Sequence, residues 1–529
     1  MRKMKQQVGI VLIIGTVISG TISAATNYVV TPGTPGVTPT ANYTSWATAA
    51  TNIQDAVDVA VSGDVVLVTN GTYYLTNTIT IGTAITLRSY NNGFVDRDGT
   101  VIDGNYPVAT NRCLYVNDAA VTIEGFTITG GFAATNDPSG GNGGGIYLYK
   151  KGNITNCLVT GNAAARSGGG IRTQYGSLIT ITASTITMNA ATNNTASAGG
   201  FGGGIYLNGG ILSGCSITSN RSGFQGGGLY MYTYGGTVTN CTIAGNVAQP
   251  LPGVGGSSGY GGALWAGWSG TIEGCTIVSN QVGPSTTGSA LGGAGAAPGN
   301  GMVMKDCLIA YNSTIGGGGY GGGVACGNGR TVFNCIIRNN SAANGGGVTP
   351  GANGLLENCT IVSNSSAAFV SGGTMRNCLF ADNSGGINVY YGSVARFENC
   401  TVAGHPGVGI SFRVPAVMDN CVVSGNNSGG DNWSYNTEVG TNTVWTNSCT
   451  TPVLSGSADI GNTTNAPLFV DSTAGNYRLR YSSPCVNTGI DRDWMTGAVD
   501  LDGNPRLVGT VDMGAYELPP SPGTCIIIR

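Results

Sequence analysis

The sequence predicts an all-β protein that folds as a parallel β-helix. This would be a solenoid of about 12–14 coils with an N-terminal capping helix and a small C-terminal domain. One observation is a phrase that occurs ten times, in which Asn, Gly or Asp precedes a Cys, and Asn or His follows that Cys five residues later. The other is a glycine-rich run that ends in an aliphatic residue, such as Gly-Gly-Gly-Ile, between most copies. Each unit then contains two short strands, and such strands bury an apolar face only when units stack.

Composition and charge exclude several other classes of protein. Of 529 residues, 91 are glycine, and they occur in clusters without the Gly-X-Y period of collagen. Hydrophobic residues make up 41% of the chain, which is too many for a chain that stays disordered. The 22 basic and 25 acidic residues nearly balance, so we expect no nucleic-acid partner.

The first 25 residues have the pattern of a signal peptide. Arg2, Lys3 and Lys5 form a positive segment, an apolar run covers 8–18, and small residues lead to an expected cleavage site after Ala25. The apolar run is short for a membrane span. We therefore expect an exported monomer, extracellular or at the cell surface, that does not span a membrane after this segment is removed.

The N-terminal cap is predicted from helical periodicity. Residues 63–64 end the predicted helix, and 65–68 begin the first strand of the solenoid. The repeat stops near residue 430, which divides the mature chain into an N-terminal segment with the capping helix (26–64), a β-helix (65–430) and a C-terminal domain (431–529). The apolar residues that recur at helical spacing within 45–61 are Ala49, Ile53, Ala56, Val57 and Ala60.

The Cys of the repeated phrase takes the same position in each coil, which we call the slot. Ser184 and Phe126 occupy the slot in two further copies. The residue before it is Asn, Gly or Asp in eleven of the twelve copies, Ala183 being the exception. These types tolerate a left-handed backbone, which would bend the chain there. The slot cysteines are Cys157, Cys215, Cys241, Cys275, Cys307, Cys335, Cys359, Cys378, Cys400 and Cys421.

The bend predicts which side chains are buried. In the copy around Cys241, the residues Val238, Cys241 and Ile243 are expected to face the interior. Slot side chains in successive coils point the same way, which is poor geometry for a disulfide, so the slot cysteines are expected to be buried thiols. Cys326 falls at an inward strand position and is expected in the core.

Several stretches resemble known families. The phrases GGGIYL and NCTIVSN resemble repeats of polymorphic outer-membrane proteins and of right-handed parallel β-helix proteins with the pectate-lyase-like fold. The stretch IQDAVDVAVSGDVVLVTNGTYY resembles the capping helix and first strand of that fold. The phrases APLFVD, YRLRYSSPCVNTG and DLDGNPRLVGTVDMGAYE are similar to the bacterial choice-of-anchor Q domain. The last resemblance implies an exported protein with a sorting-type C-terminal domain, in which Cys449 and Cys485 match the two-cysteine pattern and are expected to form a disulfide.

Many relatives with this fold cleave acidic polysaccharides, so an enzyme must be considered. Glycoside hydrolysis needs two carboxylates at one bond, and lyase chemistry needs a base and a cation. Between Asp137 and Asp382 the only acids are Glu273, Asp306 and Glu357. We therefore expect no catalytic residue and keep a polysaccharide lyase or glycoside hydrolase as the alternative.

Charged residues recur two positions before the slot. Arg376 and Lys305 share this register with five acids, and stacking would place unlike charges side by side in ladders on a solvated face. Exposed pairs of this kind contribute about 0–1 kcal/mol each. The five acids are Glu124, Glu273, Glu357, Glu398 and Asp419.

Two other polar features are interpreted as structural. His405, the single histidine, takes the Asn position of its repeat and is expected to make a turn hydrogen bond. Asp500 and Asp502 resemble part of a calcium loop but lack its third acid and its distal Glu, so an Asx turn is favoured. No spacing suggests zinc, and we expect no metal and no cofactor.

A row of outward side chains is the candidate binding site. The first aliphatic residue after each Gly-Gly-Gly run should point inward, so the next residue points outward. Such a column would stack sugar rings, or it would stabilise the sheet by cross-rung stacking. The favoured function is therefore a non-catalytic protein that presents a face for polysaccharide or cell-envelope glycan, and a purely structural envelope component is a further alternative. The column residues are Tyr147, Arg172, Tyr206, Tyr230 and Trp265.

Overall fold

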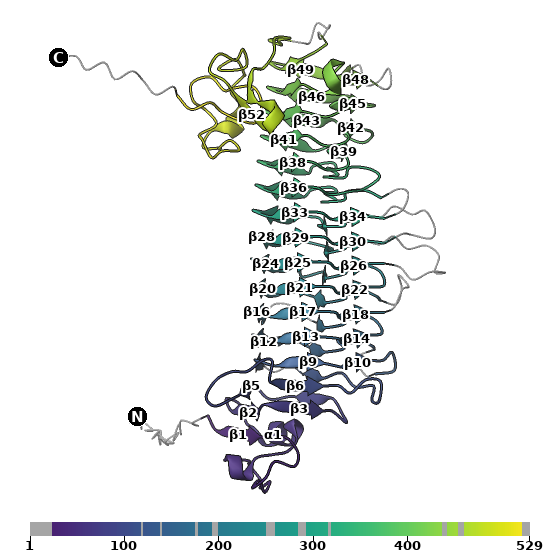
Figure 1. The fold of residues 1–529 in the computed structure, drawn as a ribbon, viewed down its shortest axis with the longest axis vertical. Helices are drawn as coiled ribbons and strands as arrows, with labels where there is room; N and C mark the ends of the chain where they lie inside the picture. Colours follow the sequence, from purple (N-terminus) through teal and green to yellow (C-terminus); the bar gives the residue numbers. More distant parts are fainter. Residues whose placement is uncertain are drawn as a thin grey trace, which may run out of the picture.

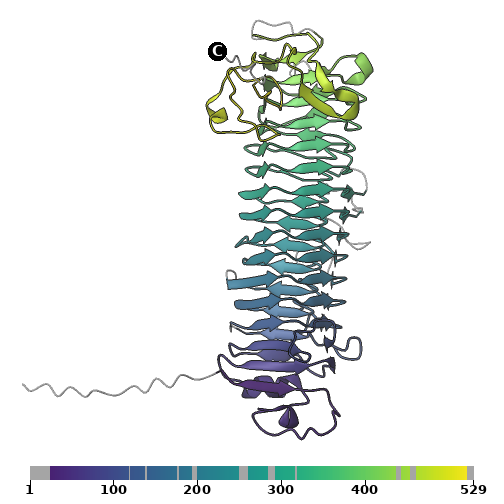
Figure 2. The ribbon, with the colours of Figure 1, turned by 60° about the vertical axis from the view of Figure 1, so that its left-hand side comes forward.

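The computed structural model describes residues 24–117, 120–137, 140–174, 178–192, 199–249, 260–283, 292–315, 319–435, 442–452 and 460–520. Most of the predicted signal peptide and all of the chain from residue 521, including Cys525, lie outside these ranges. The described chain forms a long rod of stacked coils, with the N-terminal helix at one end and the C-terminal segment beside the other (Figures 1 and 2). The predicted fold, a parallel β-helix, is confirmed.

Each full coil contains four short strands instead of the two expected. In one coil they are β11 (Ile146–Leu148), β12 (Lys151–Thr155), β13 (Leu158–Thr160) and β14 (Ala163–Ala164). Each strand pairs in parallel with its equivalents in neighbouring coils. The strand expected around the slot is divided because the chain bends there, and a second bend follows before the Asn of the phrase.

The strands stack into four sheets, which we call A to D. Sheet A has 16 strands: β1 (Thr26–Val29), β2 (Val65–Thr69), β5 (Thr86–Tyr90), β8 (Thr122–Glu124), β12, β16 (Leu178–Thr182), β20 (Ile211–Ser213), β24 (Thr237–Thr239), β28 (Gly270–Glu273), β32 (Met302–Lys305), β35 (Thr331–Phe333), β37 (Leu355–Glu357), β40 (Thr374–Arg376), β43 (Ala395–Glu398), β46 (Ala416–Asp419) and β49 (Val444–Thr446). Sheet B has 15 strands: β3 (Gly71–Tyr74), β6 (Thr100–Asp103), β9 (Thr127–Thr129), β13, β17 (Thr185–Thr187), β21 (Ser216–Thr218), β25 (Thr242–Ala244), β29 (Thr276–Val278), β33 (Leu308–Ala310), β36 (Ile336–Arg338), β38 (Thr360–Val362), β41 (Leu379–Ala381), β44 (Thr401–Ala403), β47 (Val422–Ser424) and β50 (Cys449–Thr450).

Sheets C and D lie on the rest of the coil. Single bridges at Val324 and Val348 join the two parts of sheet C. Its strands are β4 (Ile79–Ile81), β7 (Leu114–Val116), β11, β15 (Ile171–Thr173), β19 (Ile205–Leu207), β23 (Leu229–Met231), β27 (Leu264–Ala266) and β31 (Ala296–Ala297), then β39 (Ala368–Val370), β42 (Ile387–Val389), β45 (Ile410–Phe412) and β48 (Trp433–Tyr435). Sheet D consists of β10 (Phe132–Ala133), β14, β18 (Ala190–Ala191), β22 (Arg221–Ser222), β26 (Val247–Ala248), β30 (Gln281–Val282) and β34 (Ser313–Thr314).

The left-handed bend before the slot is confirmed in all twelve copies. Ala183, the residue least suited to it, has φ of 47°, close to the 52° of Asn240. Stacking therefore imposes the bend even where the side chain does not favour it. Around this bend Val238, Cys241 and Ile243 are at most 1% exposed, as predicted.

A buried asparagine ladder holds the coils together and was missed in the sequence. It is formed by the Asn at the end of each repeated phrase. Asn246 shows the pattern: its Oδ1 accepts hydrogen bonds from both the backbone N–H and the amide of Asn220 at 3.0 Å. Its Nδ2 donates to the carbonyl of Ile217 at 2.8 Å. Each amide thus satisfies backbone groups that the bends remove from the sheets.

The N-terminal cap is shorter than predicted. Helix α1 spans Ile53–Val59, whereas the first part of the predicted range holds a short 3-10 helix at Trp46–Thr48. The helix begins only at Ile53 because the side chain of Asn52 accepts from the N–H of Gln54 and caps the N-terminus. The helix buries Ile53, Ala56 and Val57 against the first coil.

The C-terminal segment packs along the side of the last coils (Figure 1). Stacking continues past residue 430 through β48, β49 and β50, and single bridges reach Ile460 and Thr463. The segment then turns back, and a hairpin joins β51 (Phe469–Asp471) to β52 (Asn476–Leu479). It also contains the 3-10 helices η4 (Ser472–Ala474) and η5 (Asp493–Met495), while η2 (Asn427–Gly429) lies between coils. No helix in the described part of the chain is long and apolar enough to cross a membrane.

Candidate functional site

The predicted column of outward residues lies on sheet C in continuous register. Tyr147 pairs with Arg172, and Arg172 pairs with Tyr206. Tyr206, Tyr230 and Trp265 then follow on successive coils. Tyr115, which no Gly-Gly-Gly run precedes, extends the column by one coil toward the N-terminus.

The column is packed against itself rather than open, which corrects the expectation of an accessible aromatic face. Tyr147, Tyr206 and Tyr230 are only 5%, 6% and 4% exposed. Tyr230 stacks on Tyr206 with ring centroids 5.0 Å apart, and on Trp265 at 4.5 Å with an interplanar angle of 11°. Phe201 covers Tyr230 from the side at 4.7 Å. Neighbouring rings therefore occupy the faces that a sugar would use.

Arg172 is part of the same stack. Its guanidinium lies 3.9 Å from the ring centroid of Tyr206 and donates to the side-chain oxygens of Asn142 and Gln174 at 3.0 and 2.9 Å. Burial lowers the pKa of Arg172 and raises the pKa of Tyr206 to about 12. The tyrosine thus stays neutral, and the cation–π contact stabilises the column.

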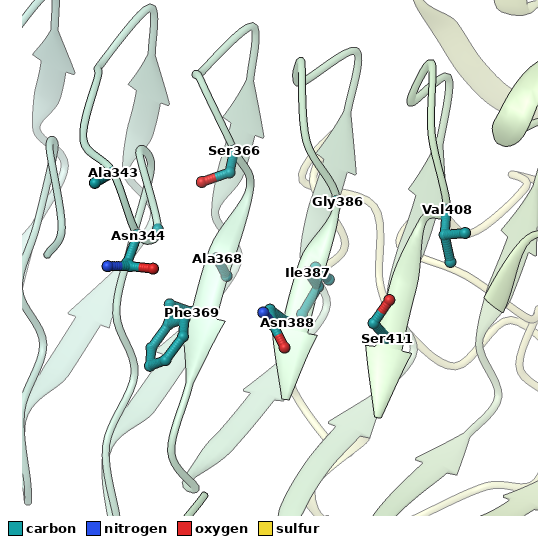
Figure 3. Close-up of a pocket in the computed structure, with 11 residues that line it drawn as sticks. Ala343, Asn344, Ser366, Ala368, Phe369, Gly386, Ile387, Asn388, Val408 and Ser411 are labelled. Atoms are coloured by element: carbon teal, nitrogen blue, oxygen red, sulfur yellow. The ribbon is translucent and has the colours of Figure 1, made fainter. Parts of the chain in front are cut away.

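Farther along sheet C the outward side chains become small and polar after Phe369. Phe369, Asn388 and Ser411 lie in register on β39, β42 and β45. They line a hollow of about 230 Å³ together with Asn344 and Ser366 (Figure 3). None of its lining residues is charged. The hollow offers hydroxyl and amide groups beside one aromatic ring.

Asn388 has a free hydrogen-bonding group at this hollow. Its Oδ1 is buried, and no hydrogen-bond partner lies near it among the described residues. A buried acceptor without a partner is costly, so the packing around Asn388 leaves this oxygen unsatisfied. Tyr390 and Tyr391, 37% and 54% exposed, follow Asn388 in the chain, and Tyr390 packs on Phe369 at 5.1 Å.

The predicted ion-pair ladder is present, but part of it is covered. Lys305 pairs with Glu273 at 2.8 Å and Arg376 with Glu357 at 3.0 Å. Asp419, expected on a solvated face, is only 8% exposed because Arg492 of the C-terminal segment pairs with it at 3.0 Å. The same segment places the Trp494 ring over Arg376 at 4.9 Å. Burial also raises the pKa of Glu398.

The acids are therefore in a different place from the hollow. The described strands of sheet C contain no Asp or Glu, whereas the ladder lies on sheet A. Within the described ranges, no cluster of three or more His, Cys, Asp and Glu residues is placed to hold a metal ion. The polar groups that line the hollow on sheet C are therefore hydroxyls and amides.

His405 makes the expected hydrogen bonds inside the asparagine ladder. It is 1% exposed, its Nδ1 accepts from the N–H of Asn383 at 3.3 Å, and its own N–H donates to Oδ1 of Asn426 at 3.0 Å. Burial lowers its pKa to about 4. Its Nε2 is buried with no partner among the described residues.

The cysteines are buried thiols throughout the described chain. In the slot, the Sγ of Cys241 donates to the carbonyl of Thr239 at 3.3 Å, and Cys326 is 4% exposed in the core. Cys449 and Cys485 pack in one small cluster between the last coil and the C-terminal segment. They are thiols in this structure, and their disulfide stays a prediction.

The Asp500 loop has the geometry of a turn. One carboxylate oxygen of Asp500 accepts from the N–H groups of Asp502 and Asn504 at 2.9 and 2.8 Å. The other accepts from the N–H of Glu517 at 2.8 Å. Asp502 forms an ion pair with Arg478 instead of facing Asp500. This pattern fits the Asx turn.

Parallel coils, inward slots and a buried asparagine ladder define a β-helix protein. A family model described as "Right handed beta helix region" matches residues 112–343, 261–414 and 348–465. These ranges cover more than half of the chain, which therefore belongs to this family. The search of curated proteins found no match.

Several solved structures are similar to the chain at low sequence identity. Pectate lyase Pel9A is 14% identical over 94% of this chain and 98% of its own, with a TM-score of 0.29. The Dettilon tailspike protein is 16% identical over 78% of this chain and 69% of its own, with a TM-score of 0.33. The GH136 lacto-N-biosidase from Eubacterium ramulus is 12% identical over 79% and 67%, with a TM-score of 0.26.

Proposed function

We propose that this chain is an exported, secreted or surface-associated β-helix protein that binds a neutral polysaccharide without cleaving it. The hollow on sheet C carries this proposal, because it places the amide of Asn388 and the hydroxyl of Ser411 beside Phe369, whose ring is 8% exposed and packs on the 37% exposed Tyr390. A pyranose ring has an apolar C–H face and a polar rim of hydroxyl groups. An aromatic ring beside hydrogen-bonding groups complements both.

The distribution of charge favours a neutral ligand. Arg221 is the only charged residue between Arg172 and Glu273, and it lies on sheet D. A polyuronate needs cations to balance its carboxylates, whereas none of the residues that line the hollow is charged, and the sheet C cations Arg172 and Arg413 are stacked on Tyr206 and Tyr390. The lack of acids on the described strands of sheet C supports binding without cleavage.

Export and attachment are proposed from the sequence. The pattern over residues 1–25 supports export, and the similarity of the C-terminal domain to the choice-of-anchor Q family supports attachment at the cell surface. The C-terminal segment packs against the side of the rod (Figure 1), and none of its described residues lines the sheet C hollow.

Affinity gel electrophoresis of the mature chain tests this function. Gels would contain mannan, xyloglucan or hydroxyethyl cellulose as neutral probes, and polygalacturonate or alginate as acidic ones. We expect retardation by at least one neutral probe. The same mixtures assayed for new reducing ends and unsaturated products should show neither. Retardation by no probe, or release of such products, would overturn the proposal.

A variant of the hollow links binding to this site. Asn388→Ala removes an amide that lines the hollow and should weaken retardation about tenfold. Asn153→Ala is the matched control, because Asn153 is an exposed asparagine on β12 of sheet A. Equal retardation of both variants would place binding elsewhere.

A further inference from the structure

Two exposed aromatic residues lie at the corner between sheets C and A. Tyr234 is 64% exposed and Trp268 is 56% exposed, unlike the buried rings of the column. Tyr234 lies three residues before Thr237 and Trp268 three residues before Thr271, and these threonines pair on adjacent coils. Met231 pairs with Ala266 on the sheet C side, so the corner that holds Trp268 is one residue shorter than the corner that holds Tyr234.

A hollow of about 350 Å³ lies beside Tyr234, and Ser269, the residue after Trp268, also lines it. Gly210, Gly236 and Gly270 line it on three successive coils, next to β20, β24 and β28 at one edge of the rod in Figure 1. A side chain would not fit on this floor. A Cβ at Gly210 would lie 2.5 Å from the carbonyl of Ile179, and one at Gly270 would lie 2.7 Å from the carbonyl of Gly236.

The hollow has a polar side and an aromatic side. Thr237 and Thr271 line it as outward residues of sheet A, and Tyr234 lines it from the corner. None of its lining residues is charged. The site therefore combines hydroxyl groups, an aromatic ring and a floor without side chains.

Tyr232 connects this corner to the buried column. It is 42% exposed, and its ring centroid lies 5.9 Å from that of Tyr206 and 6.1 Å from that of Tyr230. The corner therefore rests on a packed aromatic stack rather than on a loose loop. A preorganised surface loses less conformational entropy when it binds a ligand.

We propose that this corner is a second subsite for the neutral polysaccharide, in which Tyr234 and Trp268 stack sugar rings of a chain that lies along the rod. The inference rests on the proposed function and adds a location outside the sheet C hollow. An acidic glycan would lack a cation here, whereas the C–H face of a neutral sugar packs on an aromatic ring. The hydroxyl groups of Thr237 and Thr271 line the hollow, where they would hydrogen-bond to the hydroxyl groups of the sugar.

Single substitutions test this subsite in the mature chain. Trp268→Ala and Tyr234→Ala should each weaken retardation by the neutral probe about tenfold. Trp268→Phe, which keeps an aromatic face, should restore most of it. Tyr311→Ala is the matched control, because Tyr311 is 55% exposed but lies on a different corner, outside this hollow. Melting curves of all four should overlay that of the unmodified chain, since these side chains are exposed.

The outcomes separate the subsite from the general function. If the unmodified chain binds no neutral probe, the proposed function fails and this inference fails with it. If the unmodified chain binds and Trp268→Ala and Tyr234→Ala bind equally well, only the corner subsite is overturned. Loss of binding in Tyr311→Ala to the same extent would also overturn it, because the effect would then not be specific to the corner.

Discussion

The side chain of Asn420 and the backbone of Ile490 exchange two hydrogen bonds. Nδ2 of Asn420 donates to the carbonyl of Ile490 at 2.9 Å, and Oδ1 accepts from its N–H at 2.8 Å. Asn420 also holds the left-handed bend before a slot, with φ of 52°. The residue that turns the coil thus also binds the C-terminal segment.

Bend asparagines on neighbouring coils also bind the C-terminal segment. Asn377 donates to the carbonyl of Val499 at 2.7 Å, and Asn399 donates to that of Asp512 at 2.9 Å. A row of bend asparagines therefore forms the docking surface, and Arg492 adds its ion pair with Asp419. The segment protects the sheet edges and side face of the last coils.

Asn420→Ala should loosen the C-terminal segment. The change removes both hydrogen bonds and leaves the Ile490 N–H and carbonyl without partners, at a cost of about 1–3 kcal/mol. Hydrogen exchange of amides in 476–495 should accelerate accordingly. Asn240→Ala, at an exposed bend far from the segment, is the control and should leave that exchange unchanged. If hydrogen exchange in 476–495 is unchanged in Asn420→Ala, the two hydrogen bonds between Asn420 and Ile490 do not hold the segment in place.

Tyr230→Ser should destabilise the rod. The ring is 4% exposed and stacks on Tyr206 and Trp265, so its removal leaves a cavity and breaks two stacking contacts. We expect a loss of about 3 kcal/mol, read as a lower Tm. Tyr234→Ser removes an exposed ring from the same coil and should leave the Tm nearly unchanged. An unaltered Tm in both variants would mean that the column adds little to stability.

His405 should make the protein less stable at mildly acidic pH. Burial lowers its pKa to about 4, so between about pH 6.5 and pH 4 the unfolded chain binds a proton that the folded chain does not. The free energy of unfolding should therefore fall as the pH drops through this range, by up to about 3 kcal/mol.

His405→Asn should remove most of this pH dependence. An Asn at this position matches the other ladder residues and does not titrate. Urea unfolding of both proteins at several pH values between 4 and 7 measures the difference. The prediction is wrong if the two proteins lose stability equally over this range.

Cys449 and Cys485 should be linked in the exported protein. They already share one buried cluster, and an oxidising compartment favours their pairing. Peptide mapping without reductant should recover them as one linked pair, with Cys241 and the other slot cysteines free. Closing this loop should stabilise the chain by about 3–4 kcal/mol, so reduction should lower the Tm. Recovery of both cysteines as free thiols would contradict the pairing.

The parallel β-helix could be predicted because each coil repeats the same residue types at its bends and at its buried positions. The bend residues tolerate a left-handed backbone, and the slot and strand residues alternate in burial, as the copy at Val238, Cys241 and Ile243 shows. The helix begins later than predicted, because the apolar period extends back to Ala49 whereas Asn52 caps the N-terminus just before Ile53. The asparagine ladder had a visible signal, the Asn that ends nine of the ten copies of the phrase, but its hydrogen bonds join residues of different coils.

By itself, the sequence determined the repeat, the fold and the register of Tyr147, Arg172, Tyr206, Tyr230 and Trp265, since these depend on spacing within each copy. Only the tertiary structure decided which aromatic residues are accessible. Tyr230 and Tyr234 are four residues apart, yet one is 4% exposed and the other 64% exposed. Accessibility depends on what the neighbouring coils place against each ring, and a coil's own sequence does not contain that information.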